Sequence, residues 1–190
     1  MRGIDVSTIE IRWHGRGGQG AVTANEILAG AALKEGKFIK AFPEFGPERM
    51  GAPIRAFARI SDEPITVHSQ VYYPDIVLII DATLLKGGKV VDGLKDDGAV
   101  IANYPEDNEQ LAKAVGRSNV HAVNATKIAL ETIGRPMTNT AMLGALVRIT
   151  NVVSLESIME EMRIKMSGKL SKEVVEKNLK AIQRAYEEVQ

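Results

Sequence analysis

A run of glycines near the N-terminus, HGRGGQG, is the part of this sequence whose residue types and spacing could do chemistry. Gly15, Gly17 and Gly20 have the G-x-G-x-x-G spacing of dinucleotide-binding turns. Glycine lets backbone N–H groups come close to a ligand, and the start of a following helix adds about half a positive charge. The run therefore predicts a site for a phosphate group or for a closely apposed partner surface, without deciding between them.

Within this turn we expect the ligand contacts to come from Arg16, Gly17, Gly18, Gln19 and Gly20. The adjacent Gly17 and Gly18 cost conformational entropy, which indicates main chain that is exposed or unusually bent. Arg16 and Gln19 flank the turn and could reach a phosphate or a partner's carboxylate. A purely structural role, in which the glycines only let a helix start against a sheet, explains Gly20 well and the Gly17–Gly18 pair badly.

Binding of a nicotinamide or flavin dinucleotide would also need an acidic residue at the end of the second strand, about 20 residues further on. Here the expected second strand ends at Phe42 and Pro43, and the nearest acid, Glu44, lies beyond the proline. The fit is poor. A free-standing nucleotide-dependent oxidoreductase remains an alternative hypothesis at this point.

A second candidate segment is the loop from Pro43 to Pro53, PEFGPERMGAP, which prolines and glycines hold in a fixed shape. Because a stiff loop loses little entropy when it binds, we expect Glu48, Arg49 and Gly51 to contact a partner protein. The alternative is a plain connector. Asp81, at the end of an apolar strand, is expected to cap the residues that follow it.

Self-sufficient catalysis is not expected. No serine or carboxylate is paired with a base in a recognisable order, and the three histidines lack metal-binding spacing. His14 is expected to be simply hydrogen bonded rather than a proton carrier. Because the chain has no cysteine, it cannot supply a disulfide, a thiolate zinc site or a Cys-ligated iron–sulfur cluster. We therefore predict no catalytic residue and no metal site.

The hydrophobic pattern predicts an α/β domain in which strand, glycine turn, helix and strand make a Rossmann-like first βαβ unit. A following β-hairpin makes the sheet mixed. The expected strands are Ile9–Trp13, Phe38–Phe42, Ile54–Ile60, Pro64–His68, Ile76–Ile80, Ala99–Ala102 and Val120–Val123. The expected helices are Gln19–Lys34, Leu84–Leu94, Glu109–Val115, Ala125–Ile133, one capped by Thr138 and Asn139, Leu155–Met166, and a last one capped by Ser171.

Bulk composition excludes several classes of partner. The 190 residues carry 24 basic and 24 acidic side chains, so no overall field would attract nucleic acid or an anionic membrane. We expect one domain over residues 1–190, with a flexible tail at residues 1–8. No apolar stretch reaches bilayer length and the N-terminus has no signal-peptide core, which predicts a cytoplasmic protein.

The motifs RWHGRGGQGAVTANEIL, AFPEFGPERMGAPIRAFARI, PDIVLIID and TNTAMLGAL resemble the gamma subunit of 2-oxoacid:ferredoxin oxidoreductases, especially the pyruvate and branched-chain members. The resemblance runs from about Ile9 to the C-terminus. Met50 stands where the family pattern would have a second arginine in the loop. Carried over by position, the resemblance marks Gly17 to Gly20, and also Glu48, Arg49 and Gly51.

The resemblance implies a three-layer α/β/α domain with a mixed sheet, in a complex with alpha, beta and delta subunits. Those subunits would hold thiamine diphosphate, magnesium and the iron–sulfur clusters. The complex would convert a 2-oxoacid, coenzyme A and oxidised ferredoxin into acyl-CoA, carbon dioxide and reduced ferredoxin. This chain would bind no cofactor alone and would have a structural role or contact coenzyme A. A third hypothesis is a pure scaffold without a small ligand.

Overall fold

A six-stranded mixed sheet forms the middle layer of the computed structural model, which describes residues 8–44, 50–87 and 89–190. The strand order is β2-β3-β1-β4-β5-β6. β3 runs antiparallel to both of its neighbours, and β1, β4, β5 and β6 are parallel. The strands are β1 (Ile9–Arg16), β2 (Phe38–Pro43), β3 (Pro53–Ser61), β4 (Ile76–Ile79), β5 (Ala99–Asn103) and β6 (Val120–Val123).

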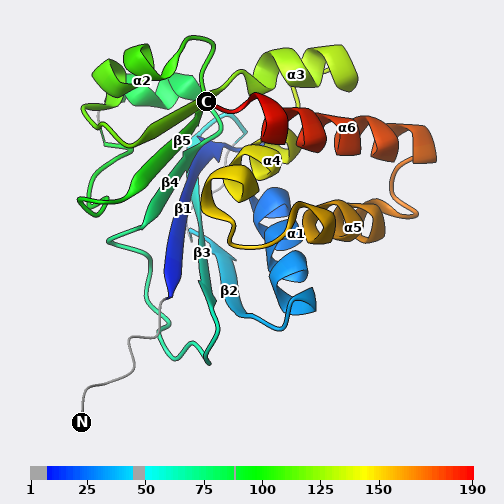
Figure 1. Cartoon of the computed structure of the whole chain (residues 1–190), viewed down its shortest axis with the longest axis horizontal. Coiled ribbons are helices and arrows are strands. Elements are labelled where there is room, and N and C mark those ends of the chain that lie inside the picture. The colour runs from blue at the N-terminus through cyan, green and yellow to red at the C-terminus, as the bar shows by residue number, and fades with distance from the viewer. Residues whose placement is uncertain (1–7, 45–49, 88) are drawn as a thin grey trace.

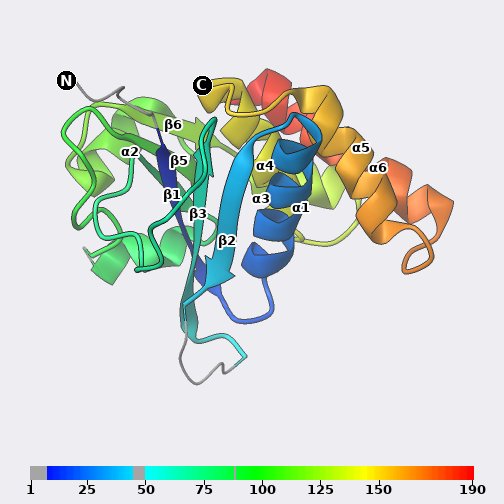
Figure 2. The same cartoon turned by 90° about the horizontal axis from the view of Figure 1, so that it is seen from below.

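Helices cover both faces of this sheet (Figure 1). Both views place α1, α4, α5 and α6 on one side and α2 on the other (Figure 2). This confirms the three-layer α/β/α arrangement. The helices are α1 (Ala21–Lys34), α2 (Asn108–Val115), α3 (Ala125–Thr132), α4 (Asn139–Thr150), α5 (Leu155–Met166) and α6 (Lys172–Glu188), with a 3₁₀ helix η1 (Ala82–Gly87).

Alternation along β1 sends its side chains to two different cores. Ile11 and Trp13 are fully buried in the larger core, beneath α1 and α4. Arg12 and His14 point to the opposite face, beside the smaller core that contains Val77 of β4. β4 itself is buried along its whole length, as its continuous apolar run predicts.

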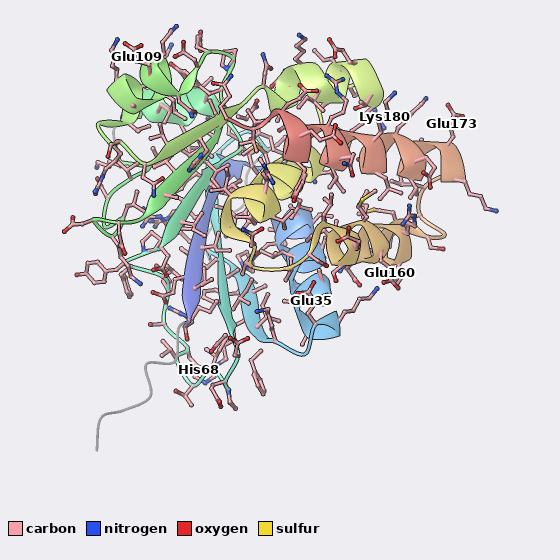
Figure 3. All side chains as sticks on the ribbon, viewed as in Figure 1. Glu35, His68, Glu109, Glu160, Glu173 and Lys180 are labelled. Carbon is pink, nitrogen blue, oxygen red and sulfur yellow. The ribbon has the colours of Figure 1, made fainter. Side chains whose placement is uncertain are left out.

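Small residues let α4 lie directly against α6. A Cβ added at Gly144 would overlap the carbonyl oxygen of Ile182 and would lie 3.0 Å from the backbone nitrogen of Tyr186. Glycine at this position therefore allows the close approach of the two helices. On the outer surface of α6, Glu173 and Lys180 project away from the body of the molecule (Figure 3).

Two expected elements are wrong. Pro64–His68 is not a strand, because both edges of β3 are already paired, with β2 and with β1. The hairpin of this fold is instead β2–β3. The expected helix Leu84–Leu94 is reduced to η1, and beyond it the chain turns at Gly93, whose φ of +73° and contact with the Tyr72 carbonyl exclude a side chain.

The other expected elements are present within a few residues of their predicted bounds. Among the described residues, no helix combines the length and the apolarity needed to cross a bilayer. The expected tail at residues 1–8 falls almost entirely outside the described residues.

Candidate functional site

The glycine turn lies between two neighbouring strands, β1 and β4, whose following connections run toward opposite edges of the sheet. From β1 the chain crosses through α1 to β2 on one side, whereas β4 is followed by β5 on the other side. In open α/β sheets, ligands bind at such a switch point, at the carboxyl ends of the strands. The turn after β1 and Asp81 after β4 meet there, which makes this edge the candidate site.

Two glycines of the turn adopt backbone conformations that side chains disfavour. Gly18 has a φ of +89° and Gly20 a φ of +78°. Gly20 is the N-cap of α1, and its carbonyl accepts the hydrogen bond from the N–H of Ala24 at 3.0 Å. Within the described chain, the N–H groups of Gly18 and Gly20 have no hydrogen-bond partner. Both N–H groups are therefore candidate donors to a ligand.

Gly17 is bound to the loop that precedes β3. Its N–H donates to the carbonyl of Ala52 at 2.9 Å, and its carbonyl accepts from the N–H of Gly51 at 3.0 Å. Met50 lies over the turn, with its sulfur atom 2.6 Å from where a Cβ of Gly18 would be. Two segments that the sequence suggested separately thus form one surface.

Arg16 and Gln19 both point to the carboxylate of Asp81. Arg16 Nε lies 3.2 Å from Asp81 Oδ2, and Gln19 Nε2 donates to the same oxygen at 2.7 Å. Arg16 also donates to Thr83 Oγ1 at 2.9 Å and to the carbonyl of Gly51 at 3.1 Å. In this structure the carboxylate that Arg16 reaches belongs to its own chain.

Asp81 also caps η1, as expected, because its Oδ1 accepts from the N–H of Thr83 at 2.9 Å. Burial alone would raise the pKa of Asp81, but hydrogen bonds from Thr83 and Gln19, together with the charge of Arg16, outweigh burial and lower it. The carboxylate is therefore ionised at neutral pH and holds the glycine turn to the end of β4.

Two hollows flank Gln19. One, of about 440 Å³, lies across the carboxyl ends of β4, β5 and β6, and its polar wall is largely uncharged: Thr83, Asn103, Asn124, Thr126 and Thr138, with Asp81 the single acid. The other, of about 210 Å³, adjoins Gly18 and Gly20 and is lined mainly by apolar side chains, among them Met137, Met162, Met166 and Leu170.

Asn139 forms the polar end of the smaller hollow. Its Nδ2 donates to the carbonyl of Gly20 at 3.2 Å. Its Oδ1 is buried and has no partner among the described residues. An unpartnered buried acceptor is costly, so it favours a ligand or partner that brings an N–H or O–H group. A Cβ at Gly20 would lie 2.5 Å from this amide, which explains the glycine there.

Asn139 is the residue that the sequence did not reveal as part of the site. Its position before a helical pattern indicated a cap, and 119 residues separate it from Gly20. Only the packing of α4 against α1 brings them together. Gly51 is exposed with a φ of +78°, while Glu48 and Arg49, the other expected partner contacts, lie outside the described residues.

The structure removes the geometric basis for a dinucleotide site. In the dinucleotide fold, β2 lies beside β1 and brings its terminal acid to the ribose. Here β3 separates the two strands. Glu44 instead pairs with Arg55 of β3, through a hydrogen bond of 2.8 Å from Arg55 Nε.

A comparison with known families now decides the assignment. The model of the pyruvate ferredoxin/flavodoxin oxidoreductase family matches residues 10–188. The chain belongs to this family. It is 50% identical over 180 residues to the "pyruvate/ketoisovalerate oxidoreductases common subunit gamma" of Thermococcus kodakarensis, covering 94% of this chain and 95% of that protein.

Solved structures agree with the assignment to the oxidoreductase family. The pyruvate oxidoreductase subunit PORC from Thermotoga maritima superposes with a TM-score of 0.86 at 46% identity, over 96% of this chain and 97% of that one. The 2-oxoglutarate:ferredoxin oxidoreductase of Magnetococcus marinus, solved with coenzyme A bound, shares the fold with a TM-score of 0.75 at 24% identity. The superposition covers 94% of this chain and 30% of that larger one.

The family assignment leaves the nucleotide-dependent alternative without support. The described residues contain no cluster of three His, Asp or Glu side chains that could hold a metal ion. His14 is hydrogen bonded, as expected, and lies on the sheet face away from α1. The candidate site is built from main chain, amides and apolar side chains, together with the ion pair of Arg16 and Asp81.

Proposed function

We propose that this chain serves as the gamma subunit of a 2-oxoacid:ferredoxin oxidoreductase, with pyruvate as the oxoacid, and that its glycine turn binds coenzyme A. Near-complete coverage of relatives named as gamma subunits supports the first part. The second part depends on the N–H groups of Gly18 and Gly20 and the Oδ1 of Asn139, which flank one turn and have no hydrogen-bond partner among the described residues.

The chemistry of coenzyme A fits these groups. Its phosphates suit the exposed N–H groups of the turn and the start of α1. Its pantetheine arm is narrow and carries amide N–H groups, one of which could donate to Asn139 Oδ1 while the rest lies against Met162 and Leu170. When bound, coenzyme A supplies the thiol that accepts the acyl group, and the residues here hold and orient it.

The remaining parts of the reaction belong to other chains. Alpha, beta and delta subunits would carry thiamine diphosphate, magnesium and the iron–sulfur clusters, and would pass electrons to ferredoxin. Without cysteine, this chain has no thiolate ligands for such a cluster. We place the contact with a catalytic partner on the loop that includes Glu48, Arg49 and Gly51, because Gly51 and Gly17 join this loop to the proposed coenzyme site.

Substitution of Gly18 in the assembled complex tests the proposal. Gly18→Ala and Gly18→Asp both place a Cβ at φ +89°, but only the second adds a charge that repels phosphate. We expect Gly18→Asp to raise the KM for coenzyme A at least about tenfold above that of Gly18→Ala, which corresponds to about 1.4 kcal/mol. The KM for the oxoacid should stay the same.

Gly116→Asp is the matched control. Gly116 ends α2 with a φ of +68°, has open space around it and lies on the opposite side of the sheet. This control should leave both KM values unchanged. Equal KM values for coenzyme A in both Gly18 variants would reject the coenzyme site. A loss of assembly without a change in KM would favour the scaffold hypothesis.

A further inference from the structure

A third hollow, of about 420 Å³, lies on the other face of the sheet and is not used by the proposed coenzyme site. It is bordered by the ends of β1 and β3, by η1 and by residues 89 and 90. Its apolar wall comes from Pro53, Leu84 and Val90, and its polar groups are His14, Glu44, Arg55 and Lys89. A mostly apolar hollow of this size with a few polar groups is typical of a small-ligand site.

The hydrogen bond from Arg12 fixes which ring nitrogen of His14 can act as a donor toward this hollow. Its Nε2 accepts a hydrogen bond from Arg12 Nε at 3.0 Å, and an arginine can only donate. The neutral ring must therefore carry its proton on Nδ1. Burial, together with the charges of Arg12 and Arg55, lowers the pKa of His14 to about 3, so the ring stays neutral. Among the described residues, Nδ1 has no hydrogen-bond partner.

Arg12 leaves a positive charge behind the histidine. It is only 4% exposed, and its Nη2 donates to the carbonyls of Val90 at 3.0 Å and Asp92 at 2.6 Å. No carboxylate of the described chain forms an ion pair with it. Burial, followed by the charge of Arg55, lowers the pKa of Arg12, whereas the charges of Asp92 and Glu44 act in the opposite direction. These two carboxylates therefore already offset part of the charge of Arg12.

Lys89 adds a second cation at the rim. It is exposed and makes no ion pair with any described residue. The remaining pair in the wall, Arg55 and Glu44, neutralises itself through two hydrogen bonds. Since the charges of Asp92 and Glu44 offset part of that of Arg12, the exposed Lys89 is the cation of this wall that has no counter-ion among the described residues, and it lies beside apolar side chains.

We propose that this hollow binds a small organic acid, with its carboxylate accepting from His14 Nδ1 and facing Lys89, and its apolar body against Pro53, Leu84 and Val90. The neutral imidazole selects an acceptor, and the charge of Lys89 selects a negative charge. This site is independent of the coenzyme proposal, since it lies on the opposite face of the sheet from α1 and shares no residue with either hollow beside Gln19.

Binding is tested on the full chain with isovalerate and its neutral analogue isovaleramide, followed through the backbone amide NMR signals of Leu84 and Val90. Isovalerate should shift these signals in a saturable way, and isovaleramide should bind at least tenfold more weakly. Lys89→Met, which removes the charge and keeps an unbranched side chain, should weaken isovalerate binding at least threefold. Lys86→Met is the matched control, because Lys86 is exposed on the same segment and does not line the hollow.

His14→Phe removes the donor and should weaken isovalerate binding further. If that variant does not fold, Lys89→Met still decides. Equal binding of acid and amide, or no saturable shift, overturns the proposal. An equal loss of isovalerate binding in Lys89→Met and Lys86→Met also overturns the proposal. If isovalerate fails while Lys89→Glu weakens assembly of the complex and Lys86→Glu does not, the hollow instead receives a carboxylate of a partner subunit, and the small-acid site is wrong.

Discussion

The contact between α4 and α6 predicts that Gly144→Ala destabilises the chain. The added Cβ would overlap the carbonyl oxygen of Ile182 and lie 2.9 Å from its carbonyl carbon. Neither atom can move alone, because both belong to the backbone of α6. The two helices would have to separate by about 1 Å, a gap that already forfeits a quarter to a half of each dispersion contact across the interface.

Two opposing terms set the size of the effect. Overpacking of this kind costs about 1–3 kcal/mol, while replacing glycine by alanine inside a helix gains about 1 kcal/mol. Because the clash here is with main chain, we expect overpacking at or above the top of that range and a net loss of about 2 kcal/mol. For a chain of this length, that corresponds to a fall in Tm of about 4–8 °C.

Gly30→Ala is the matched control, since Gly30 also lies within a helix and its added Cβ also meets a neighbour. That neighbour is the carboxylate end of Glu161, a flexible side chain that can move aside. The control should be neutral or up to about 1 kcal/mol more stable than wild type. Urea denaturation followed by far-UV circular dichroism measures both variants. If Gly144→Ala is as stable as Gly30→Ala, close helix packing does not explain the glycine.

Three further outcomes concern titration and capping. Asp81→Asn should cost about 1–3 kcal/mol at neutral pH. Hydrogen bonds from Thr83 and Gln19 lower the pKa of Asp81 in the folded state despite burial. The contribution of Asp81 to the free energy of unfolding is therefore fully present above the unfolded pKa of about 3.9 and is lost as the pH falls through the lower pKa of the folded state. Urea midpoints measured against pH should show this loss in the wild type and not in Asp81→Asn. Burial lowers the pKa of His14 to about 3, so its ring should show no NMR titration near pH 6.5. Below pH 6.5 the unfolded state binds a proton that the folded state does not, so the free energy of unfolding should fall by up to about 1.4 kcal/mol per pH unit. A ring that titrates near pH 6.5 would contradict the buried neutral state. Ser171→Ala should destabilise by about 1 kcal/mol through loss of the α6 cap, and Ser171→Asp should not, as thermal unfolding would show.

Local patterns sufficed to predict most of this fold. The apolar run that became β4 and the 3–4 spacing of α6, with Ser171 before it, each need only neighbouring residues to be recognised. The incorrect predictions concern segments whose structure depends on contacts with residues far away in the sequence. Whether Pro64–His68 becomes a strand depends on whether β3 has a free edge, and β1 occupies that edge.

The candidate site was predictable in part, for the same reason. Gly18 and Gly20 stood out because their conformations require glycine, which is a local property. Only part of the role of Asp81 was predictable. Its capping of the next residues depends on local sequence, whereas its ion pair with Arg16 depends on the pairing of β1 with β4. Asn139 could not be found, since an asparagine before a helix looks like any cap until α4 packs beside the turn.

The position of β1 between β3 and β4 has a consequence for how the polypeptide acquires its shape. β1 precedes both of its neighbours in the chain, β3 and β4, which end at residues 61 and 79. Pairings between such distant segments form slowly, whereas the β2–β3 hairpin closes locally. We therefore expect nascent β1 to remain unpaired until β3 has been synthesised and to keep one free edge until β4 follows, so that its apolar Ile11 and Trp13 stay accessible to a chaperone during that time.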